Sequence, residues 1–312
     1  MESLKTKIVE NIVELIPADT LPLLVPLDSN WGVVASKRLN SYVCGQVVIV
    51  IQGQKVQISG MRSHVLTCEA QPWNGIADFT SEDLEQTTIS SIVITGNTAD
   101  APQLNLCAYA YDRSLQDAAF RTGLLKFLRS CRIATNAEIR IEELNHDVGR
   151  MLTEAIRSGF QRVFVRKLNF DLHLFFDRML KSSHLATVVI SHSSSQNYLT
   201  ILLKYRKKNL NYIVFEEPTI NTHFVRDVLN WWSNCPQIPQ PIRIKFLAPE
   251  MYKFQGFFSN MTLAKRFFNQ PSEGACFVFD HPTEHKGGRP LSTVACLRRT
   301  ELEMKLTCIP GL

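Results

Sequence analysis

The sequence predicts an α/β fold in which helix–strand units repeat and build a mainly parallel sheet. Three observations carry this prediction. Short β-type runs begin at residues 139, 163, 188, 213 and 242, so they recur 24 to 29 residues apart. A stretch with apolar residues at helical spacing precedes each run, and periods of about 20–50 residues signal stacked supersecondary units. The links between helices and strands are short, which favours parallel strands joined by right-handed crossovers.

The composition is ordinary for a globular chain of 312 residues, with 45% hydrophobic and 20% charged residues. This length suits one large domain or two smaller ones. The formal net charge of +5 is mild, whereas nucleic-acid binders concentrate positive charge on one face. The dense basic run at 204–208 ends a predicted helix, where cations suit the helix dipole. We expect no nucleic-acid partner, with a nucleic-acid or anionic-lipid patch at 204–208 as the alternative.

Three features of the sequence bear on the compartment. The N-terminus lacks the apolar run and small-residue cleavage site of a secretory signal. No window approaches the 18 apolar residues of a membrane span, so no membrane partner is expected. The eight cysteines are scattered without a Cys-x-x-Cys pair. Such cysteines indicate reduced thiols in a cytoplasmic or nuclear protein.

Residues 1–43 are predicted to form a separate helical segment. A first helix with an apolar stripe over residues 8–16 is followed by a short second helix, which Pro26 ends. Asp28 or Ser29 then caps a third helix. The remaining residues, 44–312, form the second predicted domain.

The helical segment resembles an F-box, a motif that opens with a helix bearing apolar pairs and reaches a Trp after a short polar stretch. Ile12-Val13 and residues 15–21 supply the first parts, and Ser29-Asn30-Trp31 fills the position of the Trp. The segment looks most like the divergent F-box families that are expanded in nematodes. The similarity covers about 35 of the 312 residues.

The resemblance implies that residues 4–43 dock on a Skp-type adaptor of a cullin ubiquitin ligase. The implied contacts are mostly apolar: Ile8, Ile12, Ile16, Leu21, Leu24 and Trp31. It also implies that the chain does no covalent chemistry and acts by bringing a protein substrate close to the ligase. The alternative is that the apolar stripe packs on the chain's own domain.

Residues 44–112 are predicted to be rich in strands. Runs at 47–51 and 56–58 flank Gly53, a strong hairpin signal because glycine permits positive φ. Further strands are predicted at 65–68, 92–94 and 104–107, with turn-rich connections at 70–91 and 97–102.

The repeats occupy residues 114–248, with predicted helices at 114–131, 146–158, 171–182, 195–207 and 221–233. The first two units read apolar-x-apolar-x-x-Leu-Asn, from Ile139 to Asn145 and from Val163 to Asn169. This pattern is similar to a leucine-rich repeat. The closing segment, 249–312, has an aromatic-rich stretch at 251–268, a strand at 276–279 and closing strands at 293–297 and 302–306.

A repeat sheet also predicts an interaction surface. Residues between the core-facing apolar positions point to the opposite face, and open faces of this kind serve as extended binding surfaces. The alternative is that a second layer covers this face. The predicted substrate-binding residues are Arg140, Glu142, Phe164, Arg166, Val189, Val214, Glu216, Arg243 and Lys245.

Candidate catalytic and metal-binding patterns are weak. His281 to His285 matches the His-x-x-Glu-His pattern of inverted zinc peptidases, but Pro282 inside it opposes the helix that this chemistry needs. His64 with Cys68 lacks a second ligand pair, and His192 stands among serines typical of a turn. We expect no catalytic residue, metal or cofactor, so an enzyme is the third hypothesis. An F-box-type adaptor for an unknown protein substrate is the first, and a free-standing α/β repeat protein-binding module the second.

Overall fold

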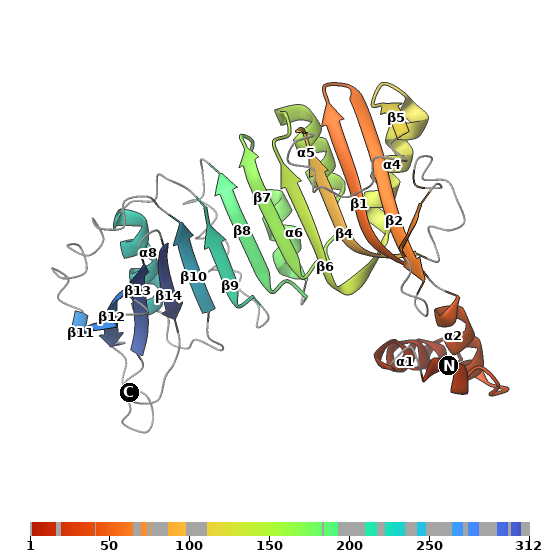
Figure 1. Cartoon of the computed structure of the whole chain (residues 1–312), viewed down its shortest axis with the longest axis horizontal. Helices are drawn as coiled ribbons and strands as arrows, with labels where there is room; N and C mark the ends of the chain where they lie inside the picture. Colours follow the sequence, from red (N-terminus) through yellow and green to blue (C-terminus); the bar gives the residue numbers. More distant parts are fainter. Residues whose placement is uncertain are drawn as a thin grey trace. The chain divides into compact units, whose positions relative to one another are not determined.

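A computed structural model of the chain describes residues 2–16, 20–40, 42–64, 70–73, 76, 87–97, 111–182, 184–192, 210–216, 222–234, 242–247, 264–270, 274–280, 292–298 and 301–306. N-terminal helices precede a strand-rich region and a series of helix–strand repeats (Figure 1), which confirms the predicted α/β fold. The chain divides into two compact units. Unit 1 comprises Met1–Arg140 and Ala155–Arg157, and unit 2 comprises Ile141–Glu154 and Ser158–Leu312.

The N-terminal segment forms the three predicted helical elements. They are α1 (Glu2–Leu15), the 3-10 helix η1 (Leu21–Leu23) and α2 (Asn30–Leu39). Helix α1 ends two residues before Pro17, since a residue that precedes proline avoids the helical region. Ser29, in extended conformation, is the N-cap of α2, although its side chain makes no capping hydrogen bond.

The predicted hairpin is confirmed in unit 1. Strand β1 (Tyr42–Gln52) pairs antiparallel with β2 (Lys55–His64), and Gln52 lies opposite Lys55. Gly53 has a φ of 62°, the sign required at the first loop position of a II′ turn. Glycine adopts this conformation without strain.

The other strands of unit 1 differ in part from the prediction. Strand β3 (Ala70–Pro72) lies inside the stretch predicted as a loop, and β4 (Thr87–Thr95) begins earlier than predicted. A three-residue edge strand is too short to show alternation, which explains the miss. Strand β5 (Tyr111–Ser114) pairs with β2, and β1 runs parallel to β4. The strands predicted at 65–68 and 104–107 lie outside the described residues.

Helix α4 (Ala118–Ser130) starts at a side-chain cap. The Oδ1 atom of Asp117 accepts hydrogen bonds from the backbone N of Ala119 at 2.9 Å and of Phe120 at 3.2 Å. These bonds satisfy amide groups that have no partner within the helix. Strand β6 (Arg132–Glu142) follows, is longer than the predicted run at 139–141, and contains the boundary between the two units.

The predicted repeats continue through unit 2. The elements are α5 (His146–Ala155), β7 (Arg162–Leu168), α6 (His173–Lys181), β8 (Thr187–His192), β9 (Tyr212–Phe215), α8 (Thr222–Asn234) and β10 (Ile242–Leu247). Strands β7, β8, β9 and β10 are parallel in that order, as predicted. The helix predicted at 195–207 lies outside the described residues.

The closing strands return to the sheet out of sequence order. Strand β14 (Glu301–Leu306) pairs antiparallel with β10, and β13 (Ser292–Arg298), β12 (Gly274–Asp280) and β11 (Ala264–Gln270) follow in that order. Three of them match predicted strands, whereas β11 was not predicted. The sheet of unit 2 is therefore parallel through its repeats and antiparallel at this end.

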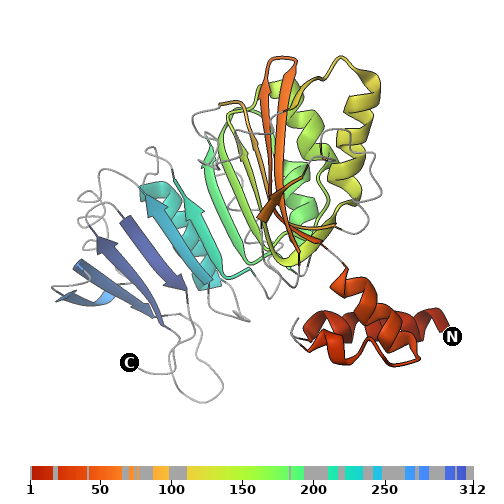
Figure 2. The same cartoon turned by 45° about the vertical axis from the view of Figure 1, so that its right-hand side comes forward.

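The core of unit 2 lies between its strands and its helices. Helices α5, α6 and α8 cover one face of the strands (Figures 1 and 2). Side chains that alternate toward this face are fully buried, among them Val163, Val165 and Phe215. Phe215 on β9 meets Phe224 on α8 edge to face, with ring centroids 5.1 Å apart. Such pairs add stability beyond that of the buried area.

The apolar-x-apolar-x-x-Leu-Asn motif has a specific backbone origin. Glu143 and Lys167 occupy equivalent positions in two successive helix–strand repeats and have φ values of 53° and 49°. The extra residue at this point breaks the strand alternation, as the register shift of β7 beside Lys167 shows. Leu144 and Leu168 consequently turn back to the buried side. The motif thus lets one strand end bury three apolar side chains on the same face.

Arginine side chains close the carboxyl ends of three helices. Nη1 of Arg38 donates to the carbonyl oxygen of Ile16, just beyond α1, at 2.9 Å. Nη1 of Arg157 donates to the carbonyl of Cys131 at the end of α4, also at 2.9 Å. Arg178 donates to the last carbonyls of α5. A guanidinium supplies both the hydrogen-bond donor and the positive charge that a helix end lacks.

Cys131 is buried at the end of α4, and burial raises the pKa of its thiol to about 12, opposed by the nearby Arg157. The thiol should stay protonated and resist alkylation by iodoacetamide at about pH 9, because the thiolate is the reactive form. Peptide mass spectrometry should find Cys131 modified only after unfolding in urea. Equal modification rates in the folded and unfolded chain would contradict this expectation.

The same raised pKa of Cys131 predicts how the free energy of unfolding changes with pH. The pKa of the folded state lies above the ordinary value of 9.0, so the stability due to the protonated thiol is complete below about pH 9. It is lost as the pH rises from about 9 toward 12. The Cys131→Ala variant should lose less stability over this interval than the natural chain. Urea titrations at several pH values measure the difference.

Candidate interaction surfaces

The N-terminal helices form a small core of their own. Its buried members come from all three elements, and Ile16, Leu24, Trp31 and Leu39 pack against them: Val9, Val13, Leu21, Val34 and Ala35. Two polar contacts link α1 to α2. Arg38 bonds to Ile16, and Nδ2 of Asn30 donates to Oγ1 of Thr6 at 3.5 Å. The described residues of α1, η1 and α2 therefore hold together through contacts with each other.

The same helices leave large apolar side chains in water. Ile8 is 53% exposed and Leu23 is 75% exposed. Monomeric proteins expose single apolar residues routinely, whereas several on one short segment indicate an interaction site. We name these residues the exposed apolar set: Ile8, Ile12, Leu23, Val25, Leu27 and Val33.

The residues predicted to contact an adaptor fall into three groups. Ile8 and Ile12 belong to the exposed apolar set. Ile16, Leu24 and Trp31 are half-buried against the helical core, and Leu21 is fully buried within it. Ile8 and Ile12 can contact a partner, whereas Leu21 stabilises the fold of the helical segment.

Sequence reasoning missed the rest of the exposed apolar set, namely Leu23, Val25, Leu27 and Val33. Leu21 and Leu23 sit in one 3-10 turn, and Val33 adjoins the buried Val34, so composition could not distinguish the exposed residue from the buried one. An amphipathic analysis of α2 alone carries a partial signal, because Val34 and Ala35 share a side with residue 31.

The predicted substrate face lies opposite helices α5, α6 and α8 in unit 2. Phe164, Val189 and Val214 are Cα partners across β7, β8 and β9, and form an apolar strip on this face. Val189 and Val214 are buried, and Phe164 is half-buried. Lys245 on β10 continues the strip and is half-buried, while Arg243 is exposed.

A charged row runs along the carboxyl ends of the same strands. Nε of Arg166 lies 2.8 Å from Oε2 of Glu216, and its Nη2 donates to Oε1 at 3.0 Å. Nη1 of Arg166 lies 3.6 Å from Oε1 of Glu142. The Nε contact is electrostatic, because that atom is not aligned for a hydrogen bond. Arg166 crosses β8 above Ser191, its Cα partner, so the small serine leaves room for the guanidinium.

Arg140, the remaining predicted substrate residue, belongs to unit 1. Its Nε lies 3.2 Å from Oε1 of Glu138, which also accepts a hydrogen bond from the Ser91 hydroxyl at 3.4 Å. Glu138 thus partly neutralises Arg140. The nine predicted substrate-binding residues therefore belong to both units, with eight of them in unit 2.

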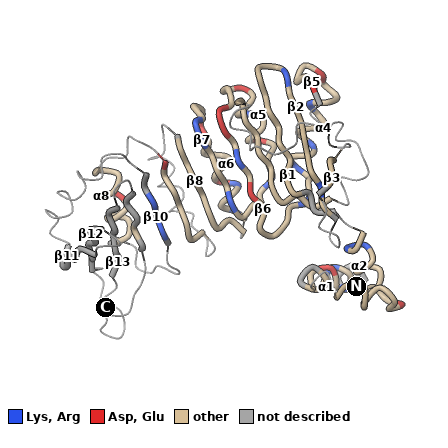
Figure 3. Tube along the Cα trace, viewed as in Figure 1, with Lys and Arg blue, Asp and Glu red and all other residues tan. Residues whose placement is uncertain are grey.

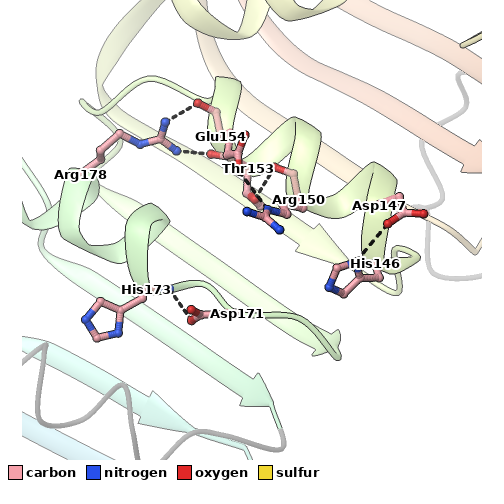
Figure 4. A network of polar contacts seen from close by, with 8 residues as sticks. All are labelled: His146, Asp147, Arg150, Thr153, Glu154, Asp171, His173 and Arg178. Atoms are coloured by element: carbon pink, nitrogen blue, oxygen red, sulfur yellow. Dashed lines mark hydrogen bonds and ion pairs between the residues drawn. The ribbon is translucent and has the colours of Figure 1, made fainter.

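Polar contacts around α5 and α6 serve the helix layer (Figure 4). Arg178 reaches the carbonyls of Thr153 and Glu154, and Nε of Arg150 lies 3.1 Å from Oε1 of Glu154. Burial lowers the pKa of Arg178, and the carboxylate of Glu154 opposes this shift. The hydrogen bonds of Arg178 join the end of α5 to α6.

The histidines of this layer sit at helix starts. Nδ1 of the exposed His146 lies 3.1 Å from Oδ1 of Asp147, and Oδ1 of Asp171 accepts from the backbone N of His173 at 2.9 Å (Figure 4). Within the described ranges, no group of three or more potential ligands could hold a metal ion. The His-x-x-Glu-His stretch at 281–285 and the serines after His192 lie outside those ranges.

Comparison of the chain with protein-family models, with curated proteins and with solved structures finds no match. No helix in the described part is long and apolar enough to cross a membrane. The fold and its surfaces define an α/β repeat protein with a helical segment at its N-terminus. Its exposed apolar set and the strand face opposite the described helices are the candidate interaction surfaces.

Proposed function

We propose that the chain is an F-box-type adaptor that recruits a protein substrate to a cullin ubiquitin ligase in the cytoplasm or nucleus. The observation that supports this most is the exposed apolar set on a helical segment with its own core. The segment packs a core of its own and still exposes Ile12 and Leu23, so these side chains are suited to bind a second apolar surface.

The energetics of such docking are favourable. Each fully buried apolar side chain contributes roughly 1.5–3 kcal/mol, so a few members of the exposed apolar set offset the entropy of association. The partner is a Skp-type adaptor. The strand face of unit 2 holds the substrate, and the chain acts by proximity with no covalent step.

The second candidate is a free-standing protein-binding module with no link to a ligase. The strand face favours it, because the half-buried Phe164 lies beside charged residues that can contact a partner without an adaptor. The two candidates differ only in what the N-terminal helices bind.

The Ile12→Asp variant should lose retention on an immobilised Skp-type adaptor by at least about tenfold. A buried aspartate at an apolar interface leaves an unpaired charge, and central apolar residues carry most interface energy. Ile12 suits this test better than Leu24, which packs on the helical core. The measurement is the fraction of purified full-length chain retained at fixed adaptor concentration.

Asn11→Asp is the matched control, because Asn11 is an exposed neighbour on α1 and gains the same charge. Circular dichroism should show equal helix content in both variants and in the natural chain. Failure of the natural chain to be retained would sink the adaptor proposal and leave the free-standing module. An equal loss of retention in both variants would mean that the added charge, and not the loss of the Ile12 side chain, weakens binding, which would contradict the apolar contact.

A further inference from the structure

A row of four polar residues crosses the strand face of unit 2 near the amino ends of its parallel strands. Arg162 on β7 is the Cα partner of Thr187 on β8, which is the partner of Tyr212 on β9. Tyr212 is in turn the partner of Arg243 on β10. We name these four residues the basic row. Lys305 occupies the next register position, on β14.

The groups of the basic row are available for a ligand. Arg162 and Arg243 are exposed, and neither forms an ion pair with any described residue. Thr187 and Tyr212 are half-buried, and their hydroxyls make no hydrogen bond within the described part of the chain. At the carboxyl ends of the strands the situation is opposite, because two carboxylates hold Arg166. Unpaired positive charge is thus concentrated at the amino ends.

Strand β10, at one side of this face, adds to the positive charge. Figure 3 shows Lys and Arg on β10, a strand with no Asp or Glu. The basic row therefore presents two guanidinium groups with two hydroxyl donors between them. Such a set matches carboxylates, because guanidinium groups bind them in a bidentate fork and hydroxyls donate to the remaining oxygens.

The spacing of the row selects an extended peptide. Neighbouring strands lie about 4.8 Å apart, so three intervals place the backbones at Arg162 and Arg243 about 14 Å apart. Residues i and i+4 of an extended chain are separated by a similar distance, about 13–14 Å, and point to the same side. Residue i+2 then lies above Thr187 and Tyr212. Acidic residues at alternate positions would meet all four groups at once.

The neighbouring apolar strip favours a polypeptide over a nucleic acid. Phe164, Val189 and Val214 lie one pleat repeat, about 7 Å, from the basic row along the strands. Phe164, the half-buried member of this strip, can be covered by an apolar side chain of a bound protein, whereas a phosphate backbone would leave its ring in water. Nucleic-acid binding also calls for denser positive charge than two described arginines and a net charge of +5.

We propose that the basic row binds an extended acidic segment of a partner protein, with Asp or Glu at alternate positions. This inference rests on the proposed function, in which that partner is the substrate to be ubiquitinated. It adds the chemical class of the segment that the strand face selects.

The test measures binding of a fluorescent peptide to the full-length chain by anisotropy. The peptide carries Glu at three alternate positions in a neutral polar background, and a second peptide has Gln at the same positions. Arg162→Gln and Arg243→Gln should each weaken binding of the Glu peptide about fivefold, as expected for exposed charge pairs. The double variant should weaken it about 25-fold, because sites this far apart act additively. Arg129→Gln, at an exposed position on α4, is the control of equal charge and should leave binding unchanged.

Equal affinity for the Glu and Gln peptides would overturn the inference, as would tighter binding of single-stranded DNA that the same arginine variants abolish. The adaptor retention assay on these variants separates the two proposals. Retention without peptide binding removes only this inference. Charge-dependent peptide binding without retention removes the ligase link and keeps the basic row as a site of the free-standing module.

Discussion

Replacing Gly32 with alanine is expected to unfold the N-terminal helical segment and abolish adaptor retention. A Cβ atom at this position would overlap the carbonyl oxygen of Leu27 and lie 2.9 Å from that of Val25. Both obstacles are backbone atoms, which cannot swing away as a side chain would. The cost should be about 3 kcal/mol or more, the upper range of overpacking. Amide hydrogen exchange read by mass spectrometry should show lost protection over residues 5–40.

Gly45→Ala is the matched control for this substitution. The nearest atom to its added Cβ is a carbonyl oxygen of Met61 at 4.0 Å, an ordinary contact. The control should keep full protection in the helical segment and in β1. Protection of residues 5–40 in Gly32→Ala that equals the natural chain would show that the approach of α2 to the preceding turn is looser than described.

Truncation of Phe215 should be a severely destabilising core change in unit 2. Its side chain is fully buried on the helix-covered face and meets Phe224, so Phe215→Ala removes a ring pair and leaves a cavity. Such substitutions cost about 3–5 kcal/mol. The free energy of unfolding from urea titration, followed by hydrogen exchange within unit 2, measures the loss.

Phe164→Ala makes the informative comparison, since it removes the same side chain from a strand of the same sheet. Phe164 points away from the described helices and is half-buried, so its loss should cost only about 1 kcal/mol. Equal costs at the two positions would indicate that a second layer covers the strand face. The predicted substrate surface would then be part of the core.

The repeats were predictable from sequence because their information is local. Val163 and Val165 have apolar counterparts 25 residues later in Val188 and Ile190, and again in Ile213 and Phe215, and each faces the helix layer. The same locality revealed the strand face, since alternation assigns Arg166 and Glu216 to one side. That Arg166 joins two carboxylates across an intervening strand needed the register, which no periodicity contains.

Elsewhere the deciding interactions are not local. Ile8 and Val9 are equally apolar, and packing against η1 and α2 determines that Val9 is buried and Ile8 exposed. Strand β11 escaped prediction because its two aromatic residues, Phe267 and Phe268, are adjacent and therefore give no alternation. The pairing of β10 with β14 escaped it because the two strands are separated by three others in the sequence.

This last pairing has a consequence for the nascent chain. As the chain leaves the ribosome amino end first, β8, β9 and β10 can each join the strand before it on emergence. The second edge of β10 must then wait for residues 248–300, several seconds at about 5–20 residues per second. Throughout that delay β10 presents an open strand edge, a known template for aggregation. Its two cations, Arg243 and Lys245, are the kind of edge charge that discourages wrong pairing, so they would still protect this edge in a chain that stopped before Glu301.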